Sequence, residues 1–183
     1  HPWISFQLDL RQAPPGLWIA LGEAASKCEH LSRVPLRPAT SQLLHRLYLA
    51  KGVAATTAIE GNTLSEEDVL KAVEGKLDVP PSKAYLKQEV ENIIEACNLI
   101  GNQLASGTLP PLTPKLIHDY NRQVLNRLPL EEGVVPGELR TYSVVVGNVY
   151  LGAPAEDCEH LLERLCDWLN GADFEPREGM AAI

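Results

Sequence analysis

The sequence predicts a mainly α-helical protein that carries one β-hairpin. Two observations lead to this fold class. Apolar residues recur every three or four positions through most of the 183 residues, which is the spacing of one helix face. After residue 136 this period gives way to two short runs rich in β-branched and aromatic residues, 141–146 and 149–151, separated by Gly147-Asn148. Two turn-forming residues between such runs are a hairpin signal.

Composition restricts the classes of function. The chain is long enough for one domain, or for a small domain and part of another. Its formal net charge of −8, without a cluster of Lys and Arg, disfavours a general binder of nucleic-acid backbones. No apolar run reaches the roughly 18 residues of a membrane span. The four cysteines contain no Cys-x-x-Cys pair, so we expect reduced thiols in a cytoplasmic protein and no metal site.

Residues 1–34 are expected to form an N-terminal arm and a first helix. Trp3 and Phe6 precede Pro14-Pro15 in a stretch without helical period, which predicts an extended arm able to lay two aromatic rings on a neighbouring surface. The helix is predicted over residues 16–31. Its apolar side carries Leu17, Trp18, Leu21, Ala24, Ala25 and Cys28.

Residues 35–107 form the second predicted region, which opens with a helix that ends near Glu60. Thr40 or Ser41 is expected to cap its start, with Pro38 just before it. Gly61-Asn62 can take the left-handed backbone that ends a helix. Glu60 then lies at the negative end of the helix dipole, where a carboxylate is disfavoured by about half a kcal/mol unless a cation faces it. We therefore expect a positively charged partner for Glu60.

Two more helices are predicted in this region. Ser65 followed by Asp68 has the spacing of a capping box, and the short helix that it starts ends at Gly75. The longest periodic segment covers residues 82–105 and ends at Ser106-Gly107. Its stripe, expected to be core throughout, consists of Tyr85, Leu86, Val90, Ile93, Ile94, Cys97, Ile100 and Leu104.

Residues 108–183 form the third region. Thr113 is predicted to cap a helix that has Pro114 at its first position and continues through Leu128. After the hairpin, whose strand edges could recruit an extended peptide, a helix is predicted over residues 156–170. Residues 179–183 resemble the start of another apolar helix, so we expect the chain to be a piece of a longer protein.

Three motifs in this order resemble the Fic family. The first is Thr56-x-x-x-Glu60-Gly61, similar to its inhibitory motif Ser/Thr-x-x-x-Glu followed by Gly or Asn. The second is Pro136-Gly137-Glu138-Leu139-Arg140, which leads into a hairpin called the flap. The third is a helix that ends in Asp167-Trp168-Leu169-Asn170. The resemblance covers residues 35–183 and implies a Fic-type helical bundle, seen here as its N-terminal part.

The resemblance also implies a function. Fic proteins bind ATP with Mg²⁺ and transfer AMP to a Ser, Thr or Tyr hydroxyl of a target protein. Glu60, in the motif of Thr56, Glu60 and Gly61, would pair with an active-site arginine and obstruct the ATP γ-phosphate. The flap, here Val144, Val145, Val146 and Gly147, would align the target segment by main-chain pairing. A homodimer is also considered as a partner, and nucleic acid only if a DNA-binding module follows.

One part of the family pattern does not occur in this sequence. The signature His-Pro-Phe-x-x-Gly-Asn-Gly-Arg-x-x-Arg, which supplies the general base and the anion-binding turn, is absent between His1 and Ile183. In the family it follows the flap and the next helix, so we expect it beyond residue 183 and predict no catalytic residue here. The alternatives are a separate inhibitory module that acts on a partner Fic chain, as an antitoxin does, and a non-catalytic helical scaffold.

Overall fold

The computed structural model describes residues 4–6, 10–147 and 149–171. The described chain consists of six α-helices, three short 3₁₀ turns and one two-stranded antiparallel hairpin, which confirms the mainly α-helical prediction. Three predictions lie outside the described residues: the arm aromatic Trp3, the turn residue Asn148 and the helix start at 179–183.

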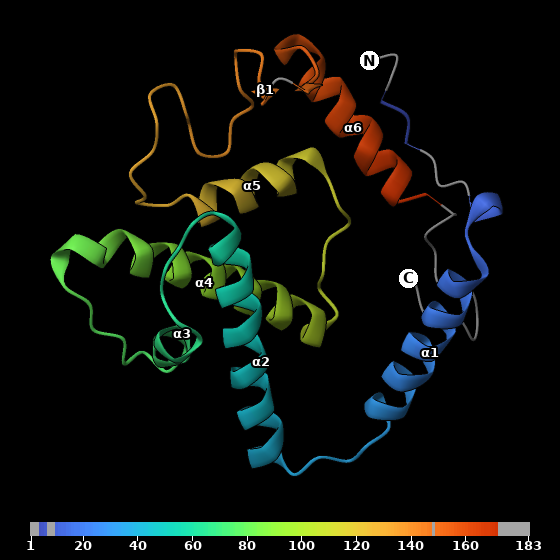
Figure 1. Ribbon diagram of the computed structural model, residues 1–183, viewed down its shortest axis with the longest axis vertical. Helices are drawn as coiled ribbons and strands as arrows, with labels where there is room; N and C mark the ends of the chain where they lie inside the picture. Colours follow the sequence, from blue (N-terminus) through green and yellow to red (C-terminus); the bar gives the residue numbers. More distant parts are fainter. Residues whose placement is uncertain (1–3, 7–9, 148, 172–183) are drawn as a thin grey trace.

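The core lies where three helices meet. α2 (Pro38–Ile59) packs against α3 (Glu66–Val73) and against α4 (Ala84–Ser106), which crosses behind it in Figure 1. Apolar side chains from all three, and from the loop before α4, fill the centre; they are Ala50, Val53, Val69, Ala72, Leu77, Val90 and Ile94. Burial of each larger aliphatic side chain in this centre contributes about 1.5–3 kcal/mol.

The remaining helices of the body extend this core in sequence order. α5 (Pro114–Val124) lies on α4, and α6 (Cys158–Leu169) lies on α5 (Figure 1). Asn92 of α4, which is only 1% exposed, fixes the end of α5 because its amide donates to the carbonyl oxygens of Val124 and Asn126 at 3.0 and 2.7 Å. Those carbonyls lie at and beyond the end of α5, where a helix leaves acceptors without intrahelical partners.

α1 (Pro15–Ser32) stands apart from this body. Figure 1 shows that α1 and α2 point away from each other on either side of the short linker that joins them. Within the described part of the chain, no other helix or strand contacts it, and none of its residues is buried. The arm that precedes it does reach the body, because the rings of Phe6 and Trp168 lie 6.2 Å apart. The predicted docking of an arm aromatic is therefore confirmed for Phe6.

Several helix boundaries differ from prediction. Pro38 is the first residue of α2, not a residue before it, and Arg37 precedes the helix without a side-chain cap. Proline fits this position because the first helical N–H needs no partner. α5 ends at Val124 instead of Leu128. The C-terminal half of α4 is not core in the described structure, since Ile100 and Leu104 are 36% and 66% exposed.

The hairpin is shorter than predicted. β1 (Val145–Val146) pairs with β2 (Tyr150–Leu151), so residues 141–144 lie before the strand and Val149 belongs to the connection. The register places Val145 opposite Leu151 and Val146 opposite Tyr150. The predicted two-residue connection is therefore wrong.

Candidate functional site

The first part of the candidate site is the C-terminal end of α2, where the chain leaves the helix in a Schellman motif. The N–H of Asn62 donates to the carbonyl of Thr57 at 3.0 Å, and the N–H of Gly61 donates to that of Ala58 at 3.1 Å. This pair of bonds needs a left-handed residue, and Gly61 has φ of +90°. The predicted left-handed ending at Gly61 is confirmed.

Asn62 fixes this helix end to α4. Its side-chain amide donates to the carbonyl of Leu86 at 2.9 Å and to the carboxylate of Glu89 at 2.8 Å. Its side-chain oxygen accepts the N–H of Leu64 at 3.0 Å, and only 7% of the residue is exposed. The side-chain nitrogen and oxygen of this buried amide both have hydrogen-bond partners. Moving the helix end would break these bonds and leave buried polar groups without partners, which is energetically costly. The direction in which the chain leaves α2 is therefore specified by α4.

The two threonines of the motif have different environments. Thr57 is 3% exposed, and its hydroxyl donates to the carbonyl of Val53 at 3.0 Å within the same helix. Thr56 is exposed. Thr56 and Glu60 are four residues apart, so they share one side of the helix end. The predicted motif residues thus lie on the accessible side, and Thr57 anchors the opposite side to the core.

Glu60 presents its carboxylate to solvent. It is the residue that immediately follows α2, with φ of −86° and ψ of 4°, and it is exposed. Within the described ranges no Lys, Arg or His forms an ion pair with it. Its neighbour Ile59 is 83% exposed. An acidic group and an apolar group therefore project together from a helix end whose backbone is fixed.

The second part of the candidate site is the hairpin. Four of its apolar side chains face solvent: Val145, Tyr150 and Leu151 are more than half exposed, and Val149 is 96% exposed. Val144 is half-buried at the base, where its carbonyl accepts the N–H of Gly152 at 2.9 Å. Gly147 turns the chain with φ of +56°. These neighbouring exposed apolar side chains form a surface that can contact another chain.

The base of the hairpin is closely packed. A Cβ on Gly152 would lie 3.0 Å from Cγ2 of Val144 and 3.2 Å from its carbonyl oxygen, so a larger residue would push the two strands apart. Arg140 reaches across the same base, and its guanidinium donates to the carbonyl of Ala153. The short paired segment is thus held at its base, although an isolated hairpin is marginal in water.

The segment that leads into the hairpin is fixed to α5. Gly137 is buried with φ of +78°, and its N–H donates to the side-chain oxygen of Asn121 at 2.8 Å. A Cβ at this position would lie within 2.9 Å of three atoms of the Arg122 guanidinium group. The same Arg122, together with Lys115, binds the carboxylate of Asp119. These two hydrogen bonds lower the pKa of Asp119. The backbone angle favours glycine in this turn, whereas the overlap with Arg122 involves the far end of a flexible side chain, which can move aside.

The structure does not bring the two parts into contact. Within the described part of the chain, the hairpin contacts neither α2 nor α3, and α5 lies between them in Figure 1. If Glu60 and the hairpin belong to one active site, the residues that lie between them in that site are not among those described.

The described residues contain no site for a metal ion, since no three His, Cys, Asp or Glu side chains gather suitably. Burial raises the pKa of the Cys166 thiol, as does the nearby Asp167 carboxylate, so this thiol stays protonated and is a poor nucleophile. A search of the described helices finds none with the length and apolarity needed to cross a bilayer.

Comparison with the sequence models of known protein families finds no match to this chain.

The sequence did not predict the contact that Asn62 makes with α4. Asn62 was expected only to help end α2, yet it fixes α2 to α4 through Leu86 and Glu89, more than twenty residues later. The sequence signal that could have suggested this is the placement of an amide residue, instead of a charged one, directly after the terminating glycine.

Proposed function

We propose that this chain is the N-terminal portion of a self-inhibited protein adenylyltransferase of the Fic type. In this proposal Glu60 is the inhibitory carboxylate and the hairpin around Val145 and Tyr150 docks the target. The observation that supports it best is the presentation of Glu60. An exposed carboxylate without a described cationic partner projects from a helix end that a Schellman motif and Asn62 hold in one orientation.

A carboxylate in this position is suited to pairing with a cation from elsewhere. At a helix C-terminus the dipole disfavours a negative charge by about 0.3–1 kcal/mol, and an opposing guanidinium removes that cost. In the proposal this guanidinium belongs to the signature, which also holds ATP and Mg²⁺. These groups supply phosphoryl-transfer chemistry when bound, and the described residues contribute the brake and the target surface.

The exposed apolar hairpin supports the docking role. Its strands are two residues long, and the side chains of Val145, Tyr150 and Leu151 are accessible. An extended target segment can therefore pair with a strand edge while the side chains of the target contact these residues. The target is a protein segment that presents a hydroxyl side chain.

The test uses the polypeptide expressed to the end of its reading frame. Transfer of labelled AMP from ATP to protein should rise in Glu60→Gln relative to the parent protein, because the substitution keeps the shape and removes the charge. Glu66→Gln, at the exposed first position of α3, is the matched control and should leave transfer unchanged.

Three outcomes would contradict the proposal in different ways. No transfer by either protein, together with no stabilisation by ATP, would favour the helical scaffold. Equal transfer by both proteins would remove the brake role of Glu60. Inhibition that appears only when a second chain bearing the signature is added would favour a separate inhibitory module.

A further inference from the structure

The hairpin has backbone groups free to pair on both of its outer edges. Val144 and Gly152 lie opposite each other, and the N–H of Gly152 donates to the carbonyl of Val144 at 2.9 Å. Hydrogen-bonded and non-hydrogen-bonded pairs alternate along an antiparallel ladder, so the next pair, Val145 and Leu151, directs its backbone groups outward. Among the described residues, no further strand pairs with either edge. An extended segment can therefore be added to the hairpin as another strand.

Acidic residues are concentrated around the hairpin. Residues 129–159 contain six acidic residues and one basic residue, whereas the whole chain has 24 acidic and 16 basic residues. Five of these six acidic side chains are exposed and form no ion pair within the described ranges; they are Glu131, Glu132, Glu138, Glu156 and Glu159. Their negative charge is therefore open to solvent and available to a partner.

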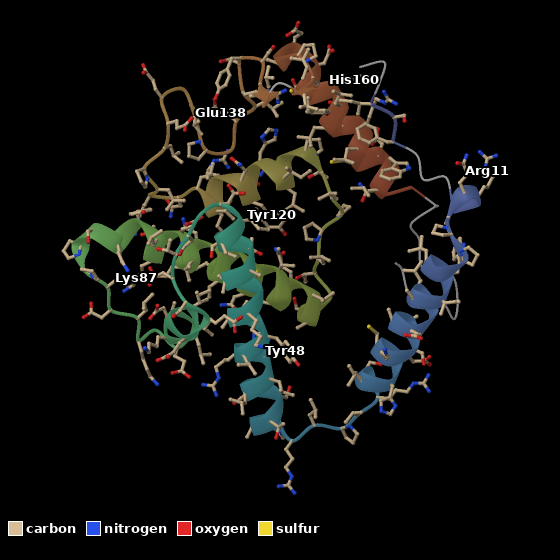
Figure 2. All side chains as sticks on the ribbon, viewed as in Figure 1. Arg11, Tyr48, Lys87, Tyr120, Glu138 and His160 are labelled. Carbon is tan, nitrogen blue, oxygen red and sulfur yellow. The ribbon has the colours of Figure 1, made fainter. Side chains whose placement is uncertain are left out.

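Three of these carboxylates belong to the segment that enters the hairpin. Glu131 and Glu132 lie in a turn that rests against the chain just before β1, because a Cβ on Gly133 would lie 3.9 Å from Cε1 of Tyr142. Figure 2 shows Glu138 on the same entering segment. The entry side of the hairpin thus presents a group of unpaired negative charges.

The exit side of the hairpin is also acidic, and the cations of this region are engaged elsewhere. Glu156 lies in the 3₁₀ turn Ala155–Asp157, which follows β2 closely. Arg140 is half-buried, and its guanidinium donates to the carbonyl of Ala153 at the base of the hairpin. Arg122 of α5 is paired with an acidic residue of its own helix. Negative charge therefore dominates the exposed surroundings of both strands.

The exposed side chains of the hairpin favour an apolar residue in the added segment. Val145 and Leu151 are opposite each other, so their side chains share one face of the hairpin, where they are 58% and 54% exposed. A residue of an added strand that pairs with either one places its own side chain on the same face. An apolar side chain at that position would cover them.

We propose that the hairpin binds an extended, positively charged target segment. An apolar residue of the segment pairs with Val145 or Leu151, and flanking Lys or Arg side chains face the surrounding glutamates. Complementary charge of this kind selects partners. A second copy of this chain is disfavoured as the occupant, because it would bring the same carboxylates against each other. This inference rests on the proposed function, since it names the class of target for the same docking surface.

Peptide binding to the polypeptide expressed to the end of its reading frame tests this preference. Three fluorescent peptides share a central Val-Thr-Val and differ only in their flanking residues, which are Lys, Gln or Glu. At about 50 mM salt the Lys peptide should bind roughly tenfold more tightly than the Glu peptide, because several exposed charge pairs each contribute a small factor. Fluorescence anisotropy measures this difference, which should shrink as salt is added. Equal binding of the three peptides, or binding of none, would overturn the proposal.

A pair of charge variants locates the preference on the molecule. Glu131→Gln combined with Glu132→Gln should weaken binding of the Lys peptide severalfold and leave binding of the Gln peptide unchanged. Glu66→Gln combined with Glu67→Gln is the matched control, because these adjacent glutamates are exposed on α3, which does not contact the hairpin. Equal weakening by the two double variants would overturn the assignment to the hairpin.

Transfer of labelled AMP to the same peptides distinguishes failure of this inference from failure of the proposed function. With the Glu60→Gln protein, the Lys peptide should accept AMP faster than the Glu peptide. Equal acceptance by all three peptides would overturn the positively charged target and leave the adenylyltransferase proposal intact. Preferential binding of the Lys peptide without AMP transfer to any peptide would overturn the adenylyltransferase proposal and support the charge preference of the hairpin.

Discussion

The two halves of α2 differ sharply in how the rest of the chain supports them. In the C-terminal half, Ala50, Val53 and Thr57 are buried and the helix end is fixed by Asn62. In the N-terminal half, Leu43 is 59% and Tyr48 is 67% exposed. Figure 2 shows Tyr48 on the side of α2 that faces the open region toward α1. One continuous helix thus has one embedded half and one bare half.

This difference shows which part of α2 is held in position by contacts within the described chain. The end that carries Glu60 is positioned by contacts between α2, α3 and α4. The beginning of α2 starts at Pro38 without a side-chain cap and adds little to the core. Substitutions in the two halves should therefore differ in their effect on stability.

The largest effect is expected at Asn62. Asn62→Ala removes both donors to Leu86 and Glu89, leaves buried groups without partners, and should lower the free energy of unfolding by about 2–3 kcal/mol. Urea denaturation followed by circular dichroism measures this. Asn102→Ala, which removes the same side chain from an exposed position of α4, should leave stability unchanged or slightly raised. Equal effects at the two positions would mean that α4 does not fix the end of α2.

Two glycines of the same region should respond with opposite signs. Gly61→Ala forces a side chain into φ of +90° and should destabilise by about 1–2 kcal/mol. Gly52 lies inside α2 with open space around its Cβ position, so Gly52→Ala should stabilise by about 0.5–1 kcal/mol. Thermal unfolding of the two variants, compared with the parent, gives both values. Stabilisation by Gly61→Ala would contradict the Schellman ending.

The features that sequence predicted correctly are local ones. The left-handed Gly61, the Ser65–Asp68 capping box and the Thr113 cap all involve residues within a few positions of one another. Their geometry follows from backbone preferences and short-range hydrogen bonds, which sequence spacing determines.

The features that sequence failed to predict depend on distant contacts. The amide of Asn62 meets α4 only after the chain has passed through α3, and no spacing rule connects those positions. Apolar periodicity placed Ile100 and Leu104 in the core, yet it only identifies an apolar face and not whether a partner covers it. The strands of the hairpin were overestimated because β propensity reflects the side-chain environment more than the backbone.

A smaller effect is expected at the cap of α3, next to the embedded end of α2. Ser65→Ala removes a hydroxyl that accepts from the N–H of Asp68 and donates to its carboxylate, which should cost about 1 kcal/mol at neutral pH. Ser26→Ala, at an exposed position of α1, is the control.

The same cap should make this effect depend on pH. Hydrogen bonds from Ser65 hold the pKa of Asp68 below its ordinary value of 3.8, so folding favours the ionised carboxylate. That stabilisation is fully present above the ordinary value and is lost as the pH falls through the lower, folded value. The gap in unfolding free energy between the parent and Ser65→Ala should therefore narrow in acid. A gap that widens in acid would contradict the assignment.

The smallest effect is expected in the bare half of α2. Leu43→Ala and Tyr48→Ala remove apolar side chains that are already more than half exposed, so each should change the free energy of unfolding by less than about 0.5 kcal/mol. Val53→Ala, in the embedded half, is the contrasting variant, because it opens a cavity at a residue that is 1% exposed. Urea titrations at high and low protein concentration measure all three. A large loss at Leu43 or Tyr48 that persists on dilution would mean that the same chain covers this half of the helix. A loss confined to high concentration would place a second copy there.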